Sequence, residues 1–278
     1  MKTVRDFARF RAAGRRISMV TCYDAWSARI IQASRIDCIL VGDSAAMVMH
    51  GHDSTIPATV EMMAAHVAAV RRGAPDKLTI GDFPFLAHRQ GVAHAVAVAE
   101  RLMKAGAQAV KIEGVRGHED AIGALVEGGV PVMGHLGLTP QSVHQLGGFK
   151  VQARGEAAAA RLLADARTLA ELGAFGLVLE AVPSELARAV TDELEIPTIG
   201  IGAGPHTSGQ VLVLHDLLGC DETFRPRFVR RYLEGHALVR RALDRYAEDV
   251  ENNEFPSTEE SYHDTTDSHG RRVAAPAR

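Results

Sequence analysis

The sequence predicts an α/β fold, a (β/α)8 TIM barrel that forms a single domain. Short apolar stretches alternate with longer amphipathic ones about eight times over roughly 220 residues, which is typical of parallel strands joined by helices. Four of the apolar stretches end in an acid, at Asp43, Asp82, Glu113 and Glu180. Because the carboxyl ends of barrel strands share one rim, we expect these acids to lie together. A doubly wound open sheet is the alternative, but at this length it more often needs a second domain.

The composition allows one large core or two modest ones and gives no sign of a nucleic-acid or membrane partner. Of its 278 residues, 46% are hydrophobic and 5% aromatic, and 31 basic residues face 34 acidic ones, for a net charge of -3. This near balance gives no electrostatic reason to expect either partner. No stretch has transmembrane or signal-peptide character. The three cysteines, Cys22, Cys38 and Cys220, lack metal-ligand spacing, which predicts reduced thiols in a cytoplasmic protein.

The first part of the chain alternates as a barrel requires. A basic segment at residues 1–16 is expected to form a short leading helix. A long loop at residues 47–57 carries His50-Gly51-His52-Asp53, and loops of that length in compact domains are more often functional than idle. The other expected elements are a strand at 17–21, a helix through about residue 35, a strand from residue 39 and a helix at 59–72 that ends at Gly73-Ala74-Pro75.

A spacing repeat supports successive βα units. Apolar residues in steps of four and three predict a helix face between residues 92 and 103. Gly106 closes that helix, and Glu113 follows seven residues later. The same spacing joins Gly173 to Glu180, and a third copy runs from Gly128 to His135. We further expect strands at 197–201 and 211–214 and a charged amphipathic helix at 225–251, packed on the barrel or a neighbouring subunit. The barrel domain then covers 1–251, and the polar segment 252–278 is expected to be disordered.

Lys111 and Glu113 are charges inside an otherwise apolar strand. Two-residue periodicity places both on one face and Val110 and Ile112 on the other. Because an unpaired buried charge is costly, such a pair needs a reason. Together they can hold a metal-bound anion at the rim, and the alternative is an internal ion pair.

Asp43 and Asp82 are the candidate metal ligands. Mg2+ takes oxygen ligands, usually one or two carboxylates, and leaves positions for substrate. The sequence contains no HExxH pattern and no cysteine at a strand end, which argues against a zinc-protease site. The alternative role for either aspartate is a helix N-cap, because both fall where a loop leaves a strand.

Two further residues at strand ends are candidates for acid–base chemistry. Glu180 ends the apolar stretch GLVLE, where desolvation would raise its proton affinity and suit it to act as a general base. His135 can donate a hydrogen bond to a substrate oxygen, or it is an ordinary neutral histidine. The glycines of Gly200-Ile201-Gly202-Ala203-Gly204 can let backbone amides approach an anion, or can simply form a tight turn.

Six stretches of the sequence together carry a resemblance to a known family. They are Val41-Gly42-Asp43-Ser44, Gly51-His52-Asp53-Ser54-Thr55, Ala69-Val70-Arg71-Arg72-Gly73-Ala74-Pro75, Lys111-Ile112-Glu113-Gly114, Gly134-His135-Leu136-Gly137-Leu138-Thr139-Pro140-Gln141-Ser142 and Gly200-Ile201-Gly202-Ala203-Gly204. With these stretches the sequence resembles the ketopantoate hydroxymethyltransferase (3-methyl-2-oxobutanoate hydroxymethyltransferase) family, and the match follows the family's order from residue 17 to about residue 250. Two departures stand out. Ala45-Ala46 replaces a more usual large residue plus glycine, and Ser208 stands where the family usually has an acid, in what we take as the folate-side loop.

The resemblance implies an activity and a set of roles. The family's enzymes have a (β/α)8 barrel, use one Mg2+ per subunit, and form large homo-oligomers, commonly decamers. They transfer a hydroxymethyl group from 5,10-methylenetetrahydrofolate to 3-methyl-2-oxobutanoate, giving 2-dehydropantoate in pantothenate synthesis. By motif match, Asp43 and Asp82 would hold the metal, with Glu113 as a further or water-mediated ligand. Ser44 and Lys111 would bind the keto acid.

The residues are independently consistent with this chemistry. A metal chelated by the keto acid would act as a Lewis acid and acidify the C3 proton. Glu180 would remove that proton, and the Mg-stabilised enolate would attack the methylene carbon of the folate. Mn2+, Co2+ and a modified pterin are open alternatives to Mg2+ and folate.

Two other functions compete with this one. The first is a Mg2+-dependent carbon–carbon lyase or mutase of the isocitrate-lyase type, but those enzymes usually carry a reactive cysteine in a flexible loop, and we expect none here. The second is a non-catalytic protein that binds keto acids or supports assembly. Such a protein would tolerate loss of the base, yet Glu180, Lys111 and both aspartates are present.

Overall fold

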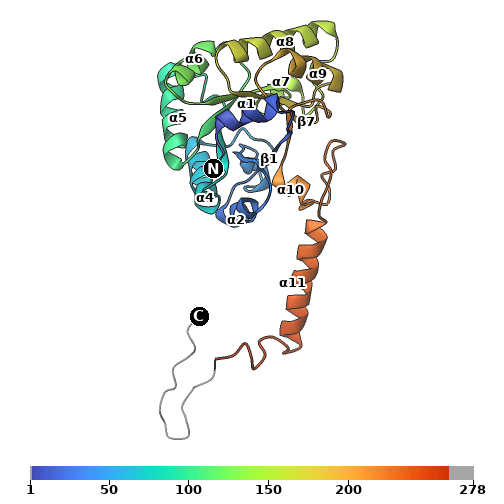
Figure 1. Ribbon diagram of the computed structural model, residues 1–278. Helices are drawn as coiled ribbons and strands as arrows, with labels where there is room; N and C mark the ends of the chain where they lie inside the picture. The colour runs from blue at the N-terminus through green and yellow to red at the C-terminus, as the bar shows by residue number, and fades with distance from the viewer. Residues whose placement is uncertain (1, 263–278) are drawn as a thin grey trace.

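The computed structural model describes residues 2–262 and contains a closed barrel of eight parallel strands. Each strand pairs with the next in chain order, and the last pairs with the first (Figure 1). The (β/α)8 prediction is therefore confirmed. The strands are β1 (Ile17–Thr21), β2 (Cys38–Val41), β3 (Leu78–Asp82), β4 (Ala109–Glu113), β5 (Val132–Gly137), β6 (Gly176–Glu180), β7 (Thr198–Ile201) and β8 (Gly209–Leu212).

The helices surround the barrel unevenly. The described helices are α1 (Val4–Ala12), α2 (Ala25–Ala33), α3 (Ala45–Val48), α4 (Val60–Gly73), α5 (Val92–Ala105), α6 (Glu119–Glu127), η1 (Pro140–Ser142), α7 (Val143–Leu146), α8 (Glu156–Glu171), α9 (Ser184–Glu193), α10 (Leu214–Leu217) and α11 (Gly235–Glu251). Long helices follow β1 to β6 in turn, but residues 202–208 join β7 to β8 without a helix, and only the short α10 follows β8. The alternation that we expected is thus incomplete at the last two units.

Strand side chains alternate between two apolar cores. Leu40, Ile80, Ala109 and Val178 belong to the core inside the barrel, whereas their chain neighbours pack in the core between sheet and helices. On β4, Val110 and Ile112 lie in the outer core. Lys111 and Glu113, which alternate with them, therefore point into the barrel near its C-terminal end, as the two-residue periodicity predicted.

Glycines follow the helices that precede β4, β5 and β6. Gly106 follows α5 with a φ of 118°, and a Cβ there would lie 2.6 Å from Arg71 Cγ, so no other residue fits without movement. Gly173 precedes β6 with a φ of 87°. In the third copy the left-handed residue is Gly129, not Gly128, because Gly128 keeps helical angles. The repeat is therefore real, with its third boundary shifted by one residue.

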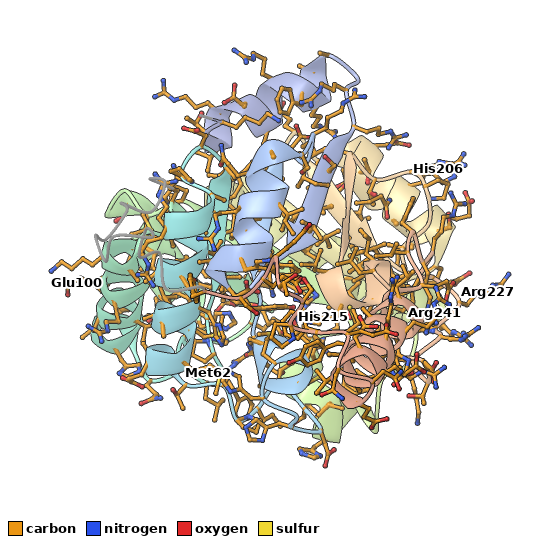
Figure 2. All side chains as sticks on the ribbon, turned by 90° about the horizontal axis from the view of Figure 1, so that it is seen from below. Met62, Glu100, His206, His215, Arg227 and Arg241 are labelled. Carbon is orange, nitrogen blue, oxygen red and sulfur yellow. The ribbon has the colours of Figure 1, made fainter. Side chains whose placement is uncertain are left out.

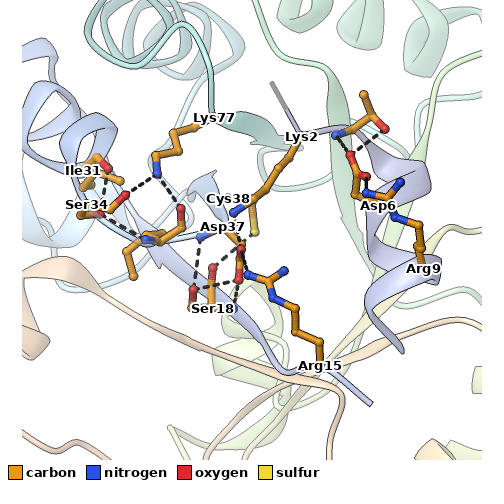
Figure 3. Close-up of polar contacts among 12 residues, drawn as sticks. Lys2, Asp6, Arg9, Arg15, Ser18, Ile31, Ser34, Asp37, Cys38 and Lys77 are labelled. Carbon is orange, nitrogen blue, oxygen red and sulfur yellow. Dashed lines mark hydrogen bonds and ion pairs between the residues drawn. The ribbon is translucent and has the colours of Figure 1, made fainter. Parts of the chain in front are cut away.

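The N-terminal end of the barrel is closed by α1 and by a buried ion-pair network. Phe7 of α1 is fully buried in the inner core and packs edge-on against Phe175. Beside it, Asp37 accepts hydrogen bonds from the Ser18 amide and hydroxyl and pairs with Lys2 and Arg15 (Figure 3). Burial alone would raise the pKa of Asp37, but these partners lower it to about 2.

The C-terminal segment departs most from the prediction. The helix expected at 225–251 begins at Gly235, and the strand expected at 211–214 spans 209–212. The helix α11 points away from the barrel (Figure 1) and buries only its first residue. Residues 252–262 contain no helix or strand, and the rest of the tail that we expected to be disordered, 263–278, lies outside the described residues. Within residues 2–262, no helix has the length and apolar character needed to span a bilayer.

Candidate functional site

The C-terminal ends of the strands border a cavity of about 1100 Å³. All seven residues that the sequence singled out line it, and they come from five consecutive strand ends. They are Asp43 and Ser44 after β2, Asp82 on β3, Lys111 and Glu113 on β4, His135 on β5 and Glu180 on β6. The common rim expected for the four acids is therefore present.

Lys111 is the cation at the centre of this acidic rim. Its Nζ lies 2.9 Å from Asp82 Oδ1, so the ion pair joins β4 to β3 rather than Lys111 to Glu113 on the same strand. Burial disfavours the ammonium, but Asp82, Glu113 and Asp43 together raise the pKa of Lys111. Lys111 is therefore protonated at neutral pH and offsets part of the negative charge.

Asp43 is buried and lacks a cation of its own. Its backbone amide donates to Asp82 Oδ2 at 3.2 Å, which fixes the two loops against each other. Burial and then the charges of Asp82 and Glu113 raise the pKa of Asp43 well above its ordinary value. The N-cap alternative is wrong for both aspartates. Ser44 occupies the cap position of α3, where its side chain makes no capping hydrogen bond, and no helix starts at Asp82.

Glu113 is held by one oxygen only. Its Oε2 accepts the backbone amide of Gln141 at 3.1 Å, whereas its buried Oε1 has no hydrogen-bond partner. Burial first, and then the charge of Asp82, raise the pKa of Glu113 to about 8 even though Lys111 opposes the shift. An orphaned carboxylate oxygen inside a protein calls for a ligand or water.

His135 connects the acidic rim to Glu180. Lys111 Nζ lies 3.0 Å from His135 Nδ1, and an ammonium can only donate, so Nδ1 is the acceptor and the ring proton is on Nε2. Nε2 lies 3.2 Å from Glu180 Oε2. Burial and the Lys111 charge lower the pKa of His135, so the ring is neutral and presents an N–H towards Glu180.

Glu180 is the most accessible acid of the set. Its side chain is 17% exposed, against 4% for Glu113, and the exposed part faces the cavity. The strong desolvation that we expected at Glu180 thus acts on Asp43 and Glu113 instead. Glu180 does not cap the helix α9, whose N-cap is Pro183. It is left as a carboxylate that a ligand in the cavity can reach.

Sequence reasoning missed two residues of the site, Tyr23 and Gln141. Tyr23 follows β1, and its fully buried hydroxyl lies 2.8 Å from Ser44 Oγ. Burial raises the pKa of Tyr23, so this contact is made by the neutral phenol. Its position after a strand end was the available signal. Gln141, on η1, donates its side-chain amide to Asp43 Oδ2, and only the resemblance to a family motif pointed to it.

The donor set suits a hard divalent cation. The rim offers carboxylate oxygens only, one of them orphaned, and Mg2+ typically takes one or two carboxylates with water and substrate in its other positions. Within residues 2–262, no group of three or more His, Cys, Asp or Glu side chains is arranged so that protein groups alone could hold a metal ion. The residues that could hold the ion are Asp43 and Asp82, with Glu113 close by.

Apolar side chains also line the cavity. They are Phe149, Val151, Phe224 and Phe228, and each is more than a third exposed. His215 of α10 lines the cavity as well and packs near Tyr23, with ring centroids 5.7 Å apart. In Figure 2, His215 lies inside the outline of the molecule, whereas Glu100 projects from the barrel's outer surface.

Cys220 also borders the cavity, in the irregular segment after α10. We expected no reactive cysteine in a flexible loop, and the position of Cys220 alone does not contradict that expectation. Burial and the neighbouring Asp216 raise the pKa of the Cys220 thiol. Reactive cysteines have a lowered pKa, so this environment is the opposite of the one that a nucleophilic cysteine needs.

Two features of the connection between β7 and β8 have structural explanations. A Cβ at Gly204 would lie 2.2 Å from Ser184 Oγ, and Gly202 has a φ of 63°, so the glycine-rich segment is required by a tight turn. Ser208 lies just before β8, at the N-terminal end of the barrel, where its hydroxyl accepts from Arg11 and the Thr198 amide. The family departure at Ser208 is thus on the end opposite to the site, not in a folate-side loop.

Comparison with known proteins gives a family and a fold. The model of the family described as ketopantoate hydroxymethyltransferase matches residues 1–258. The 3-methyl-2-oxobutanoate hydroxymethyltransferase of Coxiella burnetii (strain CbuK_Q154) is 55% identical over 255 residues, covering 91% of this chain and 96% of that protein.

Two solved structures share the fold at low sequence identity. A 2,3-dimethylmalate lyase of the PEP mutase/isocitrate lyase superfamily has a TM-score of 0.59 and 18% identity, covering 90% of this chain and 89% of that one. A phosphonopyruvate hydrolase in complex with oxalate and Mg2+ has a TM-score of 0.62 and 11% identity, covering 93% of each chain.

Proposed function

The chain belongs to the ketopantoate hydroxymethyltransferase family, and on this basis we propose that it transfers a hydroxymethyl group from 5,10-methylenetetrahydrofolate to 3-methyl-2-oxobutanoate. The product is 2-dehydropantoate, a precursor in the pantothenate pathway to coenzyme A. One observation carries the proposal. A reachable carboxylate, Glu180, faces the same cavity as a rim whose three buried acids share a single lysine, Lys111. This arrangement pairs a base with an electrophilic site.

The keto acid would bind between the rim and Glu180. Lys111 supplies a buried positive charge for the substrate carboxylate, and Ser44 supplies a hydroxyl held by Tyr23 at 2.8 Å. The Nε2–H of His135, directed towards Glu180, can donate to a substrate oxygen that comes between them. These donors orient the substrate with its C3 hydrogen towards Glu180.

Asp43 and Asp82 would hold Mg2+, with Glu113 as a further or water-mediated ligand. The bound ion would supply Lewis-acid polarisation of the keto and carboxylate oxygens. Glu180 takes the C3 proton, which leaves an enolate whose C3 bonds to the methylene carbon of the folate. The two C–N bonds of the folate's methylene carbon break, and their nitrogens take up the C3 proton from Glu180 and one proton from a water molecule. Tetrahydrofolate leaves, and the remaining hydroxide of that water forms the hydroxyl of the new group. The neutral His135 beside Glu180 adds no positive charge that would weaken this base.

The size of the cavity supports a second, larger substrate. The cavity measures about 1100 Å³, a volume similar to that of pockets that bind drug-sized molecules. A five-carbon keto acid would therefore fill only a small part of it. The apolar side chains of the cavity lining, Phe149, Val151, Phe224 and Phe228, suit the flat pterin of a folate. We place the folate there, with its one-carbon unit towards the rim.

We propose that the enzyme works in the cytoplasm as a homo-oligomer, with a decamer as the size that the family resemblance implies. The helix α11 carries an apolar stripe that is 43% to 62% exposed and consists of Val239, Leu243, Tyr246 and Val250. Contiguous exposed apolar surface of this kind marks association sites. The strands β7 and β8 lack their own covering helices, so a second copy of the chain is the occupant that we propose for the stripe.

Sedimentation velocity tests this assembly. Leu243→Glu should shift the enzyme to smaller species, whereas Arg240→Glu on the same helix should leave the sedimentation coefficient unchanged. Identical assembly of Leu243→Glu and the unaltered chain would refute a role for the stripe.

A carbon–carbon lyase is the runner-up, but nothing at the site favours it. The 2,3-dimethylmalate lyase shares the fold at 18% identity, and the cysteine at the cavity has a raised thiol pKa. The discriminating experiment is proton exchange at C3 of 3-methyl-2-oxobutanoate, followed by NMR in deuterated water with and without Mg2+, and then turnover with the folate. Mg2+-dependent exchange without carbon–carbon cleavage is expected. Its absence in folded enzyme would overturn the proposal.

A further inference from the structure

Gln141 touches three strand ends at once. Its side-chain amide donates to Asp43 Oδ2 at 2.7 Å and to the Phe83 carbonyl at 2.7 Å, and its backbone amide donates to Glu113 Oε2 at 3.1 Å. It therefore bonds to two acids of the rim and to the segment that directly follows Asp82 on β3.

The orientation of the Gln141 amide follows from its partners. A carboxylate oxygen and a backbone carbonyl can only accept, so the nitrogen of the amide must face both of them, and both of its N–H donors are used. Pro140 begins the 3-10 turn that carries Gln141, and its ring fixes the backbone angle at the start of that turn. The side chain is 4% exposed, so solvent does not compete for these donors.

These bonds select which carboxylate oxygens stay free. Gln141 occupies Oδ2 of Asp43 and Oε2 of Glu113, which leaves Oδ1 of Asp43 without a bond to Gln141 and Oε1 of Glu113 without any hydrogen-bond partner. We propose that Gln141 is a positioning residue of the cation site: it locks the Asp43 and Glu113 carboxylates so that one oxygen of each is presented to a divalent ion. This inference rests on the proposed function, because that function requires the ion.

A positioning role differs measurably from a purely structural one. Residues that hydrogen-bond to metal ligands typically contribute 10- to 100-fold to metal affinity. Gln141→Leu keeps the backbone amide and the approximate volume but removes both side-chain donors. Gln141→Asn keeps an amide that is one methylene too short to reach Asp43. The matched control is Gln32→Leu, which removes a comparable amide contact, 2.9 Å to Asp76 Oδ2, on the exposed surface.

The experiment measures Mn2+ binding by electron paramagnetic resonance on the full chain, together with the Mg2+ dependence of C3 proton exchange. Gln141→Leu should weaken Mn2+ binding about tenfold or more, and the exchange rate should recover towards that of the unaltered enzyme as Mg2+ is raised. Gln141→Asn, whose amide is too short to reach Asp43, should also weaken Mn2+ binding, and Gln32→Leu should not. A purely structural role would lower thermal stability and leave the Mn2+ dissociation constant unchanged, and that result would overturn the inference.

The outcomes separate this inference from the proposed function. If the unaltered enzyme bound no Mn2+ and exchanged no proton, the proposed function would fail first, and the positioning role with it. If the unaltered enzyme did both and both Gln141 variants bound Mn2+ equally well, only the positioning role would fail. If Gln141→Leu did not fold, Gln141→Asn would decide by the same binding measurement.

Discussion

Asp37 and Asp43 lie six residues apart and are both buried, yet their surroundings shift their pKa values in opposite directions. Asp37, at the N-terminal end of the barrel, has Lys2, Arg15 and the Ser18 donors around it, and its pKa falls to about 2. Asp43, at the C-terminal rim, faces Asp82 and Glu113, and its pKa is raised. The acid that precedes β2, Asp37, thus has cations beside it, whereas the acid that follows β2, Asp43, has no cation of its own.

The difference teaches how the two ends of the barrel are used. Partners that fully satisfy a buried charge stabilise the folded state, so the Asp37 network acts on stability. Acids that are crowded together with too little positive charge cost stability unless a ligand offsets them. The crowded acids at the rim therefore lower the stability of the folded state but create a site for a cation, as is expected at the C-terminal face of a barrel.

The largest expected effect is at the rim, on activity. Glu180→Gln keeps the shape of the side chain but removes the base, so C3 proton exchange should fall by about 10³-fold, while the keto acid still binds. NMR in deuterated water measures the exchange, and titration with the keto acid measures binding. Exchange at the unaltered rate would assign the base to another residue. It would also contradict the view that the C-terminal rim serves activity and the N-terminal end serves stability.

The next effect is on metal binding. Asp82→Asn removes a proposed ligand, so Mn2+ binding should weaken about 100-fold. In this variant the Lys111 ammonium still attracts the Glu113 and Asp43 carboxylates. The melting temperature should therefore change far less than the Mn2+ affinity. Asp53→Asn, an exposed acid at the same cavity, serves as the control and should bind Mn2+ normally. An unstable Asp82→Asn variant with normal Mn2+ affinity would make Asp82 a structural residue.

At the opposite end of the barrel, stability should change without activity. The pKa of Asp37 is lower in the folded chain than its ordinary value of 3.8, so its contribution is present above about pH 4 and is lost as the pH falls towards 2. Asp37→Asn should reduce the free energy of unfolding by about 2 kcal/mol at pH 7, with normal exchange activity.

Urea denaturation across pH values measures this contribution. The difference between the unaltered chain and Asp37→Asn should shrink between pH 4 and pH 2, and Asp76→Asn, at an exposed acid, should show no such trend. A difference that stayed constant over that range would remove the basis for the comparison.

The smallest effect is expected from the C-terminal residues. Removing residues 256–278 keeps Phe255, whose ring packs on Tyr246 of α11 at 5.4 Å, and none of the described residues that it removes, 256–262, lines the cavity. Steady-state turnover should stay within about twofold, which is within the range of surface changes. A large loss would mean that these residues take part in the site.

Local patterns predicted the barrel and the rim, but not the contacts across them. Strand periodicity placed Lys111 and Glu113 on the inner face, and glycine spacing located two strand ends, because both follow from backbone geometry. The pairing of Lys111 with Asp82 rather than Glu113 depends on the register between two strands. Gln141 reaches Asp43 across 98 positions of the sequence, a contact that no local pattern encodes. The start of α11 was missed because charged residues continue the helical pattern upstream of Gly235.

The central claim is that Asp43 and Asp82 gather one divalent ion at the rim, and a crystal structure grown with Mn2+ tests it most directly. The account predicts a single anomalous peak per subunit, about 2.1 Å from an oxygen of each aspartate, with Glu113 as a direct or water-mediated neighbour. A peak elsewhere, or a rim that stays metal-free while the enzyme exchanges protons, would contradict it.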